Sequence, residues 1–272
     1  MKKNKLAVSL IIPHYQNMFS TFYTLEIIKE VSKAAIALGV DLFIDTIWRV
    51  PRVSGILFAD AMGNEQWIKK ARKEGIPHLV LNYYSQDPKD NCISIDNEKA
   101  AFEAVEYLIH CGHKRIAIIT GKLSAQAGLQ RLEGYQRVLK AANIKSDKRY
   151  IINADWSEES GRVAMNKLLA LKLRPTAVFA CGDEMAIGAI KAVKEAGLKV
   201  PANISLVGFD NMPQAAFPQF SLTTVQQPFS DLAELGIKYL VQIIKKETRQ
   251  PVKILLTNTK LIKRESAKQL KG

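Results

Sequence analysis

Short apolar runs alternate with longer segments of helical periodicity along almost the whole chain. The run 177–180 has the length of a buried strand, and apolar residues then recur at helical spacing from Met185 to Val193. Gly197 is placed to end that helix, and the run 204–209 predicts the next strand. This order predicts one β-α-β unit, in which a right-handed crossover joins two parallel strands.

The same alternation continues in both directions and predicts an α/β fold of doubly wound parallel sheets with helices on both faces. The expected strands are 6–12, 40–44, 53–58, 77–81, 92–95, 116–119, 150–152, 177–180 and 204–209. The expected helices are 21–38, 66–74, 97–111, 131–142, 158–171, 184–196 and 229–246, and 254–262 is expected to be extended.

Two successive series show the same alternation of strands and helices, so we predict two lobes of one kind joined by two or three connections. Such a hinge permits closure over a ligand. The expected division is 1–110 plus 229–252 for the first lobe, 111–228 plus 253–266 for the second, and 267–272 as a tail.

Composition is that of an ordinary globular protein, with 47% hydrophobic and 24% charged residues among 272, and the formal net charge is +13. The lysines are mostly spread along helix faces, which favours a solvated surface. Direct nucleic-acid binding by this surface is an alternative, and it predicts salt-dependent retention of DNA.

Three scattered cysteines, Cys92, Cys111 and Cys181, argue against a disulfide framework and for a reducing compartment. The apolar run 6–12 is at the short limit for a signal peptide and is better explained as a first strand. No segment approaches the length of a membrane span. We therefore expect a soluble, cytoplasmic protein that does not bind a membrane.

Sequence motifs for catalysis or cofactors are weak. Residues 120–122 lack the spacing of a phosphate loop, and neither a Gly-x-Gly-x-x-Gly nor a Gly-x-Ser-x-Gly pattern occurs. His110, Cys111 and His113 could bind a metal, but they lie where a helix ends and no second ligand pair is near. We expect no metal, no cofactor and no enzymatic activity.

Polar residues of a binding kind follow the predicted strands. Asp183 and Asp210 stand just past the carboxyl ends of two neighbouring parallel strands, the edge at which open α/β sheets bind ligands. A helix cap and a turn residue are the alternative explanations of these two aspartates.

Further amides, a guanidinium and aromatic rings fall in similar positions, and such groups suit the hydroxyls and the apolar face of a sugar ring. Trp156 could equally be a core residue, and Arg131 could form an ion pair. The candidate ligand-binding residues are Phe19, Asn82, Arg131, Trp156, Asp183, Asp210 and Gln227.

Several stretches, in order, resemble the effector-binding core of the lactose-repressor/galactose-repressor family of bacterial transcription regulators. They are IDNEKAAFEAVEYLIHCGHKRIAIITG at 95–121, RLEGY at 131–135, PTAVFACGDEMAIGA at 175–189, SLVGFDN at 205–211, SLTTVQQP at 221–228 and LIKRES at 261–266.

The resemblance implies two flavodoxin-like lobes, as in periplasmic sugar-binding proteins, with a small effector, usually a sugar, held between them. It implies a homodimer whose effector changes the grip of a helix-turn-helix headpiece on operator DNA. Arg131 and Asp210 match the polar anchors of the effector, and Trp156 matches the aromatic residue stacked on it. Asn82, Asp183 and Gln227 fall nearby, and Phe19 matches an apolar wall.

This sequence departs from the family pattern in three places. Only residues 1–5 precede the first strand, where the family has its headpiece, and 46–52 is too short for a helix that contributes to the usual dimer face. Gly182 replaces the usual asparagine, and Ala125 and Ala127 replace polar ligand contacts. We expect a sensor domain that reaches operator DNA only through the missing headpiece. A transport-type sugar-binding protein of the same fold is the alternative.

Overall fold

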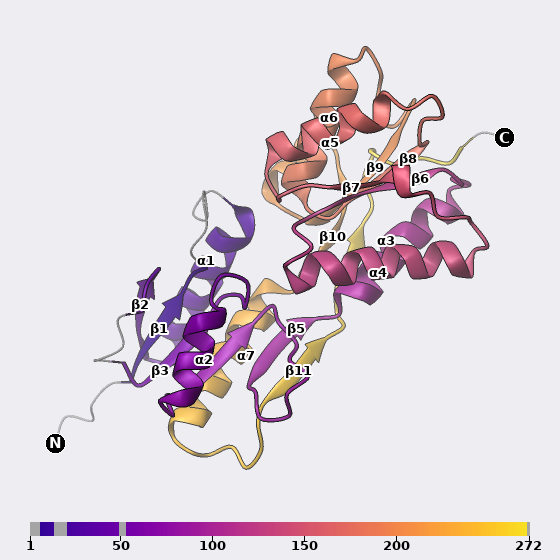
Figure 1. Ribbon diagram of the computed structural model, residues 1–272. Coiled ribbons are helices and arrows are strands. Elements are labelled where there is room, and N and C mark those ends of the chain that lie inside the picture. The colour runs from indigo at the N-terminus through magenta and orange to yellow at the C-terminus, as the bar shows by residue number, and fades with distance from the viewer. Residues whose placement is uncertain (1–5, 14–20, 49–52, 271–272) are drawn as a thin grey trace. The chain divides into compact units, whose positions relative to one another are not determined.

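The computed structural model describes residues 6–13, 21–48 and 53–270. The chain divides into two compact units, Met1–Ile95 with Pro228–Leu256 and Asp96–Gln227 with Thr257–Gly272. Each unit is an α/β domain built on one six-stranded sheet (Figure 1). This confirms the predicted fold class.

The first unit has the strand order β11-β5-β4-β3-β1-β2, and all of its strand pairs are parallel. Its strands are β1 (Ala7–Ile11), β2 (Asp41–Asp45), β3 (Gly55–Phe58), β4 (His78–Leu81), β5 (Cys92–Ile95) and β11 (Lys253–Leu256). Its helices are α1 (Phe22–Ala37), α2 (Glu65–Lys73) and α7 (Phe229–Ile244).

Alternate side chains of the central strands fill two separate layers, because successive residues of a strand point to opposite faces. Ile56 and Phe58 of β3 pack with Ala71 of α2. The intervening Leu57 faces α7, where it and Leu81 of β4 lie against Gly236. These runs are apolar at every position because both faces of the sheet are covered.

The second unit has the order β12-β10-β9-β8-β6-β7, in which only the β10–β12 pair is antiparallel. Its strands are β6 (Ile116–Thr120), β7 (Ile151–Asn153), β8 (Ala177–Ala180), β9 (Ser205–Asp210), β10 (Thr223–Gln226) and β12 (Lys260–Ile262). Its longer helices are α3 (Asn97–His110), α4 (Gln126–Ala141), α5 (Glu158–Leu169) and α6 (Asp183–Glu195), with short 3₁₀ helices η3 (Lys148–Tyr150) and η4 (Pro213–Ala216).

Helices α3 and α4 cover one face of this sheet, and α5 and α6 cover the other (Figure 1). Small residues allow the close approach of α5 and α6: a Cβ on Gly188 would lie 1.9 Å from the carbonyl oxygen of Glu158. The predicted β-α-β unit is β8-α6-β9, with β8 and β9 parallel.

The C-terminal segment 264–266 is hydrogen-bonded to strands of the second sheet and to the turn after β9, and it acts as a brace. The Ser266 hydroxyl donates to the Leu206 carbonyl at 2.6 Å and accepts from the Thr223 amide at 2.8 Å. Arg264 donates to Asn211 Oδ1 at 2.7 Å, in the turn that follows β9. The block at 261–266 therefore ties three separate segments of the unit together.

The boundaries between the units differ from those predicted. Helix α3 was assigned to the first lobe, but it packs on α4 and belongs to the second unit. The segment 254–262 is not one extended stretch: β11 pairs with β5 in the first unit, whereas β12 pairs with β10 in the second. The pattern predicted extended backbone here but gave neither the division into two strands nor the change of sheet.

Two other expectations need correction. Helix α4 begins at Gln126, five residues before its predicted start, because Ala125 and Ala127 are buried and continue its apolar face. The predicted tail is not detached, since Ala267 is buried and the Leu270 amide donates to the Cys111 carbonyl at 2.9 Å.

The three cysteines are buried and free, as expected from their scatter. Among the helices of the described residues, none combines the length and apolar character that a membrane crossing requires.

Candidate functional site

The two sheets share one topology, and it fixes where polar side chains gather. In each unit the second strand in sequence lies outside the first, and the following strands extend the sheet on the other side. The winding direction therefore reverses between β1 and β3 and between β6 and β8. Crevices form at the carboxyl ends of strands beside such a reversal.

Arg131 lies at the carboxyl edge of the second sheet and is 4% exposed. Its Nε donates to Asn97 Oδ1 at 2.9 Å, and Nη1 donates to the Cys181 carbonyl at 2.6 Å. The guanidinium carbon lies 3.6 Å from the centre of the Phe209 ring and 5.7 Å from that of Trp156. The cation is therefore held by both hydrogen bonds and aromatic faces.

Asp210 ends β9 with a backbone φ of +122°, a conformation that costs energy for a side chain other than glycine. Its Oδ1 accepts from Gln227 Nε2 at 2.5 Å. Gln227 is 6% exposed, so this hydrogen bond is largely screened from water. The structure thus brings two predicted site residues into direct contact.

Burial raises the pKa of Asp210 to about 6, while Arg131 and Gln227 act in the opposite direction. The cause is the loss of solvation of the charged form, which is larger than the attraction of the nearby cation. A carboxyl group of this kind changes charge within a mildly acidic pH range.

Asp183 is fully buried and its two oxygens are both occupied. Oδ2 accepts from the Met212 amide at 2.8 Å, and Oδ1 accepts from the Thr224 hydroxyl at 2.6 Å. Gly208 leaves the necessary space, because a Cβ there would lie 2.2 Å from Asp183 Oδ1. Asp183 therefore does not cap α6, whose N-cap is Gly182; it fixes the turn that follows β9.

Asp183 also carries a pKa well above its ordinary value, first because of burial and then because of the neighbouring Asp210 carboxylate. Two acidic groups in one low-dielectric region disfavour each other's ionised forms. Asp183 supports the backbone from which Asp210 projects.

Trp156 lies in the loop between β7 and α5 with a φ of +80°, and its side chain is half-buried. The indole lies directly over Gly121, where a Cβ would come within 2.1 Å of the ring. Glycine at the end of β6 therefore makes room for an aromatic face beside Arg131.

In the first unit, Asn82 follows β4 with a φ of +55° and is 8% exposed. Its Nδ2 donates to Asp60 Oδ2 at 2.6 Å. Burial raises the pKa of Asp60 to about 6, against hydrogen bonds from Met62 and Asn82 that lower it. The prediction for Phe19 lies outside the described residues.

Two of these partners, Asp60 and Asn97, were not predicted from the sequence. Asp60 follows β3, a strand at the winding reversal of its sheet, and a carboxylate just past such a strand was the available signal. Asn97 is 34 residues before Arg131, and nothing in the sequence indicates their contact.

His113, one of the possible metal ligands at 110–113, has other hydrogen-bond partners in the structure. His113 is 2% exposed, and its two ring nitrogens lie 3.0 Å from the Thr176 hydroxyl and 3.2 Å from the Lys268 carbonyl. Among the described residues, no group of three or more potential metal ligands is assembled. His113 joins β8 to the C-terminal segment.

Comparison with known proteins agrees with this architecture. A family model described as a periplasmic binding protein-like domain matches residues 105–267. The HTH-type transcriptional repressor PurR of Klebsiella pneumoniae (strain 342) is 33% identical over 261 residues, which cover 90% of this chain and 76% of that protein.

Solved structures extend the similarity to nearly the whole chain. A transcriptional regulator CelR–cellobiose complex has a TM-score of 0.88 at 27% identity and covers 97% of this chain and 85% of its own. The lac repressor dimer bound to operator and the anti-inducer ONPF has a TM-score of 0.85 at 25% identity and covers 98% of this chain and 96% of its own.

The relatives are transcriptional repressors and not enzymes, and the matched region carries the strand edges described above. The chain belongs to the lactose-repressor/galactose-repressor family and contains the family's periplasmic-binding-protein-like effector-binding core.

Proposed function

We propose that this chain senses a small polyhydroxylated effector, most simply a sugar, and passes the signal to operator DNA. The observation that carries the proposal is the contact network at the carboxyl edge of the second sheet. There Arg131, Asp210 and Gln227 form one hydrogen-bonded and electrostatic group beside the Trp156 ring.

These groups suit a sugar in different ways. The second Asp210 oxygen can accept from one hydroxyl, and the guanidinium can donate to its neighbour. Trp156 offers an apolar face to the ring carbons. The cellobiose bound by a structural relative supports the choice of a carbohydrate over other polar ligands.

The first unit supplies Asn82 in this proposal, with Asp60 as its positioning residue. Because Asn82 Nδ2 is directed to Asp60, the amide presents its Oδ1 as an acceptor for a ligand hydroxyl. Phe19 is the predicted apolar wall. The effector is thus gripped by residues of both units.

An effector that is bound by residues of both units couples binding to lobe closure. An effector shifts such an equilibrium only by its difference in affinity for the open and closed states. Operator binding then follows through the helix-turn-helix headpiece of the family, on a homodimer as in the lac repressor complex. A repressor acts where the chromosome is, so we place this protein in the cytoplasm.

Isothermal titration calorimetry with a panel of mono- and disaccharides tests the assignment. The chain is expected to bind at least one of them, and Asp210→Ala and Arg131→Ala are expected to weaken that binding by roughly 10–100-fold. Arg137→Ala is the control, because Arg137 lies on the same helix but pairs with Glu98 at the surface. Unchanged affinity in both site variants would refute the site.

A further inference from the structure

A pocket lies at the amino edge of the second sheet, where the strands begin. Its volume is about 610 Å³. It is lined by residues that precede β6, β8 and β9 and by the loop after α5. The polar lining consists of Arg115, Lys172, Arg174, Thr176 and Asn203.

The charge of this pocket is unbalanced. Three cationic side chains line it, and no aspartate or glutamate does. Within the ranges that the structure describes, Arg115, Lys172 and Arg174 form no salt bridge. The pocket therefore concentrates positive potential that the chain itself does not neutralise.

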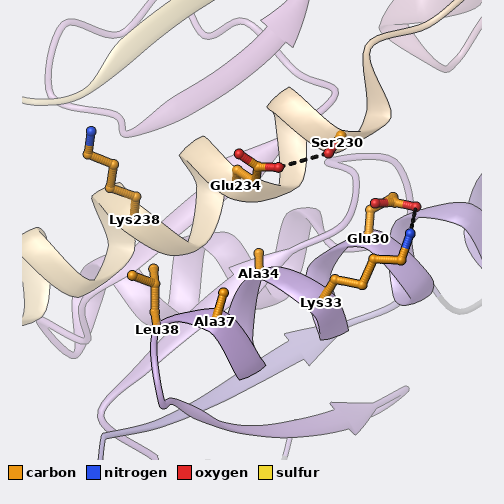
Figure 2. Close-up of a pocket in the computed structure, with 8 residues that line it drawn as sticks. All are labelled: Glu30, Lys33, Ala34, Ala37, Leu38, Ser230, Glu234 and Lys238. Carbon is orange, nitrogen blue, oxygen red and sulfur yellow. Dashed lines mark hydrogen bonds and ion pairs between the residues drawn. The ribbon is translucent and has the colours of Figure 1, made fainter.

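The groove between α1 and α7 in the first unit provides a contrast (Figure 2). There Glu30 pairs with Lys33 at 2.8 Å, and Ser230 donates to Glu234 at 2.8 Å. Two acidic and two basic side chains line that groove, so its charge is balanced. A basic surface composition alone therefore does not produce the imbalance of the second-unit pocket.

Both guanidinium groups are anchored before any ligand arrives. Arg115 Nε donates to the Arg174 carbonyl at 3.0 Å, and Arg174 Nε donates to the Leu169 carbonyl at 2.7 Å. The Tyr150 hydroxyl holds the Leu173 carbonyl of the same loop at 3.0 Å. Because Nε of each arginine is hydrogen-bonded to the backbone, the orientation of the guanidinium is fixed and its terminal nitrogens remain as donors. Two such nitrogens can bind a pair of phosphate oxygens.

We propose that this pocket binds a small phosphorylated metabolite. A phosphate monoester carries close to two negative charges and several acceptor oxygens, which match three cations better than a single carboxylate does. Leu171, Leu198 and Ile204 supply an apolar side for the remainder of the molecule. The volume lies within the range of about 300–1,000 Å³ that is usual for small-molecule sites.

The site is separate from the proposed effector edge, because it lies at the amino ends of β6, β8 and β9 and the effector residues follow their carboxyl ends. A phosphorylated metabolite bound there would act as a second input to the same regulator.

Amide NMR titrations with glucose 6-phosphate, glucose and inorganic phosphate, at constant ionic strength, test the proposal. Glucose 6-phosphate is expected to shift the amides of Thr176, Leu198 and Asn203 saturably, with inorganic phosphate weaker at the same positions and glucose silent there. Shifts confined to residues near Asp210 would instead place the phosphate at the effector edge and overturn the proposal.

Variants that lose the same charge at different places distinguish binding in this pocket from a general electrostatic attraction of glucose 6-phosphate to the basic surface. Arg115→Gln with Arg174→Gln is expected to weaken glucose 6-phosphate binding by roughly tenfold or more. Lys69→Gln with Lys73→Gln removes the same charge from exposed positions on α2 and is expected to leave it unchanged. Equal loss in both pairs, or none in the first, would refute the site; Lys172→Gln is a milder variant if the arginine pair fails to fold.

Discussion

The two sheets have the same winding order but differ in how their carboxyl edges are built. In the second unit, Arg131 is hydrogen-bonded to Asn97 and Cys181, and Asp210 to Gln227. Among the residues that the structure describes in the first unit, the equivalent edge has a carboxylate–amide pair, Asp60 with Asn82, but no buried guanidinium. Topology therefore decides where a ligand can bind, and the density of buried hydrogen bonds decides how firmly each half is preorganised.

This difference suggests that the second unit is the more rigid part of the proposed site and the first unit the more adjustable part. A buried guanidinium that already donates from Nε and Nη1 has few alternative positions, so the second unit presents a fixed recognition surface. The described edge of the first unit has no such cation, so we expect it to adjust more freely to the proposed effector. Substitutions should accordingly cost more stability in the second unit than in the first.

The largest effect is expected for Arg131→Met. The change leaves Asn97 Oδ1 and the Cys181 carbonyl without their donor and Asp210 without its nearby cation, at a cost of roughly 3–5 kcal/mol. Urea unfolding measures it. Arg137→Met on the same helix removes only a surface pair with Glu98 and is expected to cost about 0–1 kcal/mol. Equal costs would contradict the proposed rigidity of this edge.

A smaller effect is expected for Gly121→Ala. The new methyl group would occupy the place of the Trp156 ring, so the indole must move, at about 1–3 kcal/mol. Fluorescence in a Trp48→Phe, Trp67→Phe background reports the exposure of Trp156. A control at the same edge is Gly182→Ala, whose Cβ would meet nothing closer than 3.4 Å. An unshifted Trp156 spectrum in Gly121→Ala would show that the ring is not held there.

Asp210→Asn tests the buried carboxyl group through pH. The folded-state pKa of Asp210, about 6, lies above its ordinary 3.8, so the folded chain binds more protons between these values. Its contribution to stability is therefore largest below pH 4 and is lost as pH rises through 6. The asparagine variant should remove the Asp210 share of this decline, on the order of 2–3 kcal/mol, from unfolding free energies measured at pH 4–7. The share of Asp60, whose pKa is also raised to about 6, stays.

Asp147 provides the opposite control. Arg149 lowers the pKa of the exposed Asp147 to about 2, so this group contributes stability above pH 4 that is lost as pH falls toward 2. Asp147→Asn should flatten the acid side of the profile and leave the pH 4–7 region unchanged. A change in the pH 4–7 region of Asp147→Asn would contradict the assignment of that decline to the buried carboxyl groups.

The smallest stability change is expected for Asn82→Ala, at about 1–2 kcal/mol, because it removes one hydrogen bond to Asp60 and places alanine at a backbone φ of +55°. Binding of the effector should nevertheless weaken by roughly tenfold, since an acceptor for a ligand hydroxyl is lost. Calorimetric titration checks both this variant and Asp60→Ala. Equal affinity in Asn82→Ala and the native chain would remove the first unit from the proposed site.

Much of the fold could be predicted, because buried parallel strands are short continuous apolar runs with helices of clear periodicity between them. The meeting of Asp210 and Gln227 followed from the same reasoning, since their parallel strands end at one edge. The contact of Arg131 with Asn97 did not, because it depends on how α3 and α4 pack. The change of sheet between β11 and β12 could not be predicted either, since the sequence of a short extended segment does not indicate which strand it pairs with.

The brace formed by Arg264 and Ser266 has a consequence for synthesis on the ribosome. The turn carrying Asp210 is held through Asn211, Leu222 and Thr223 by residues that are translated near the end of this sequence. A nascent chain that has not yet emerged beyond residue 266 has an incomplete ligand edge. Recognition of the proposed effector thus begins only after the chain through residue 266 has left the exit tunnel.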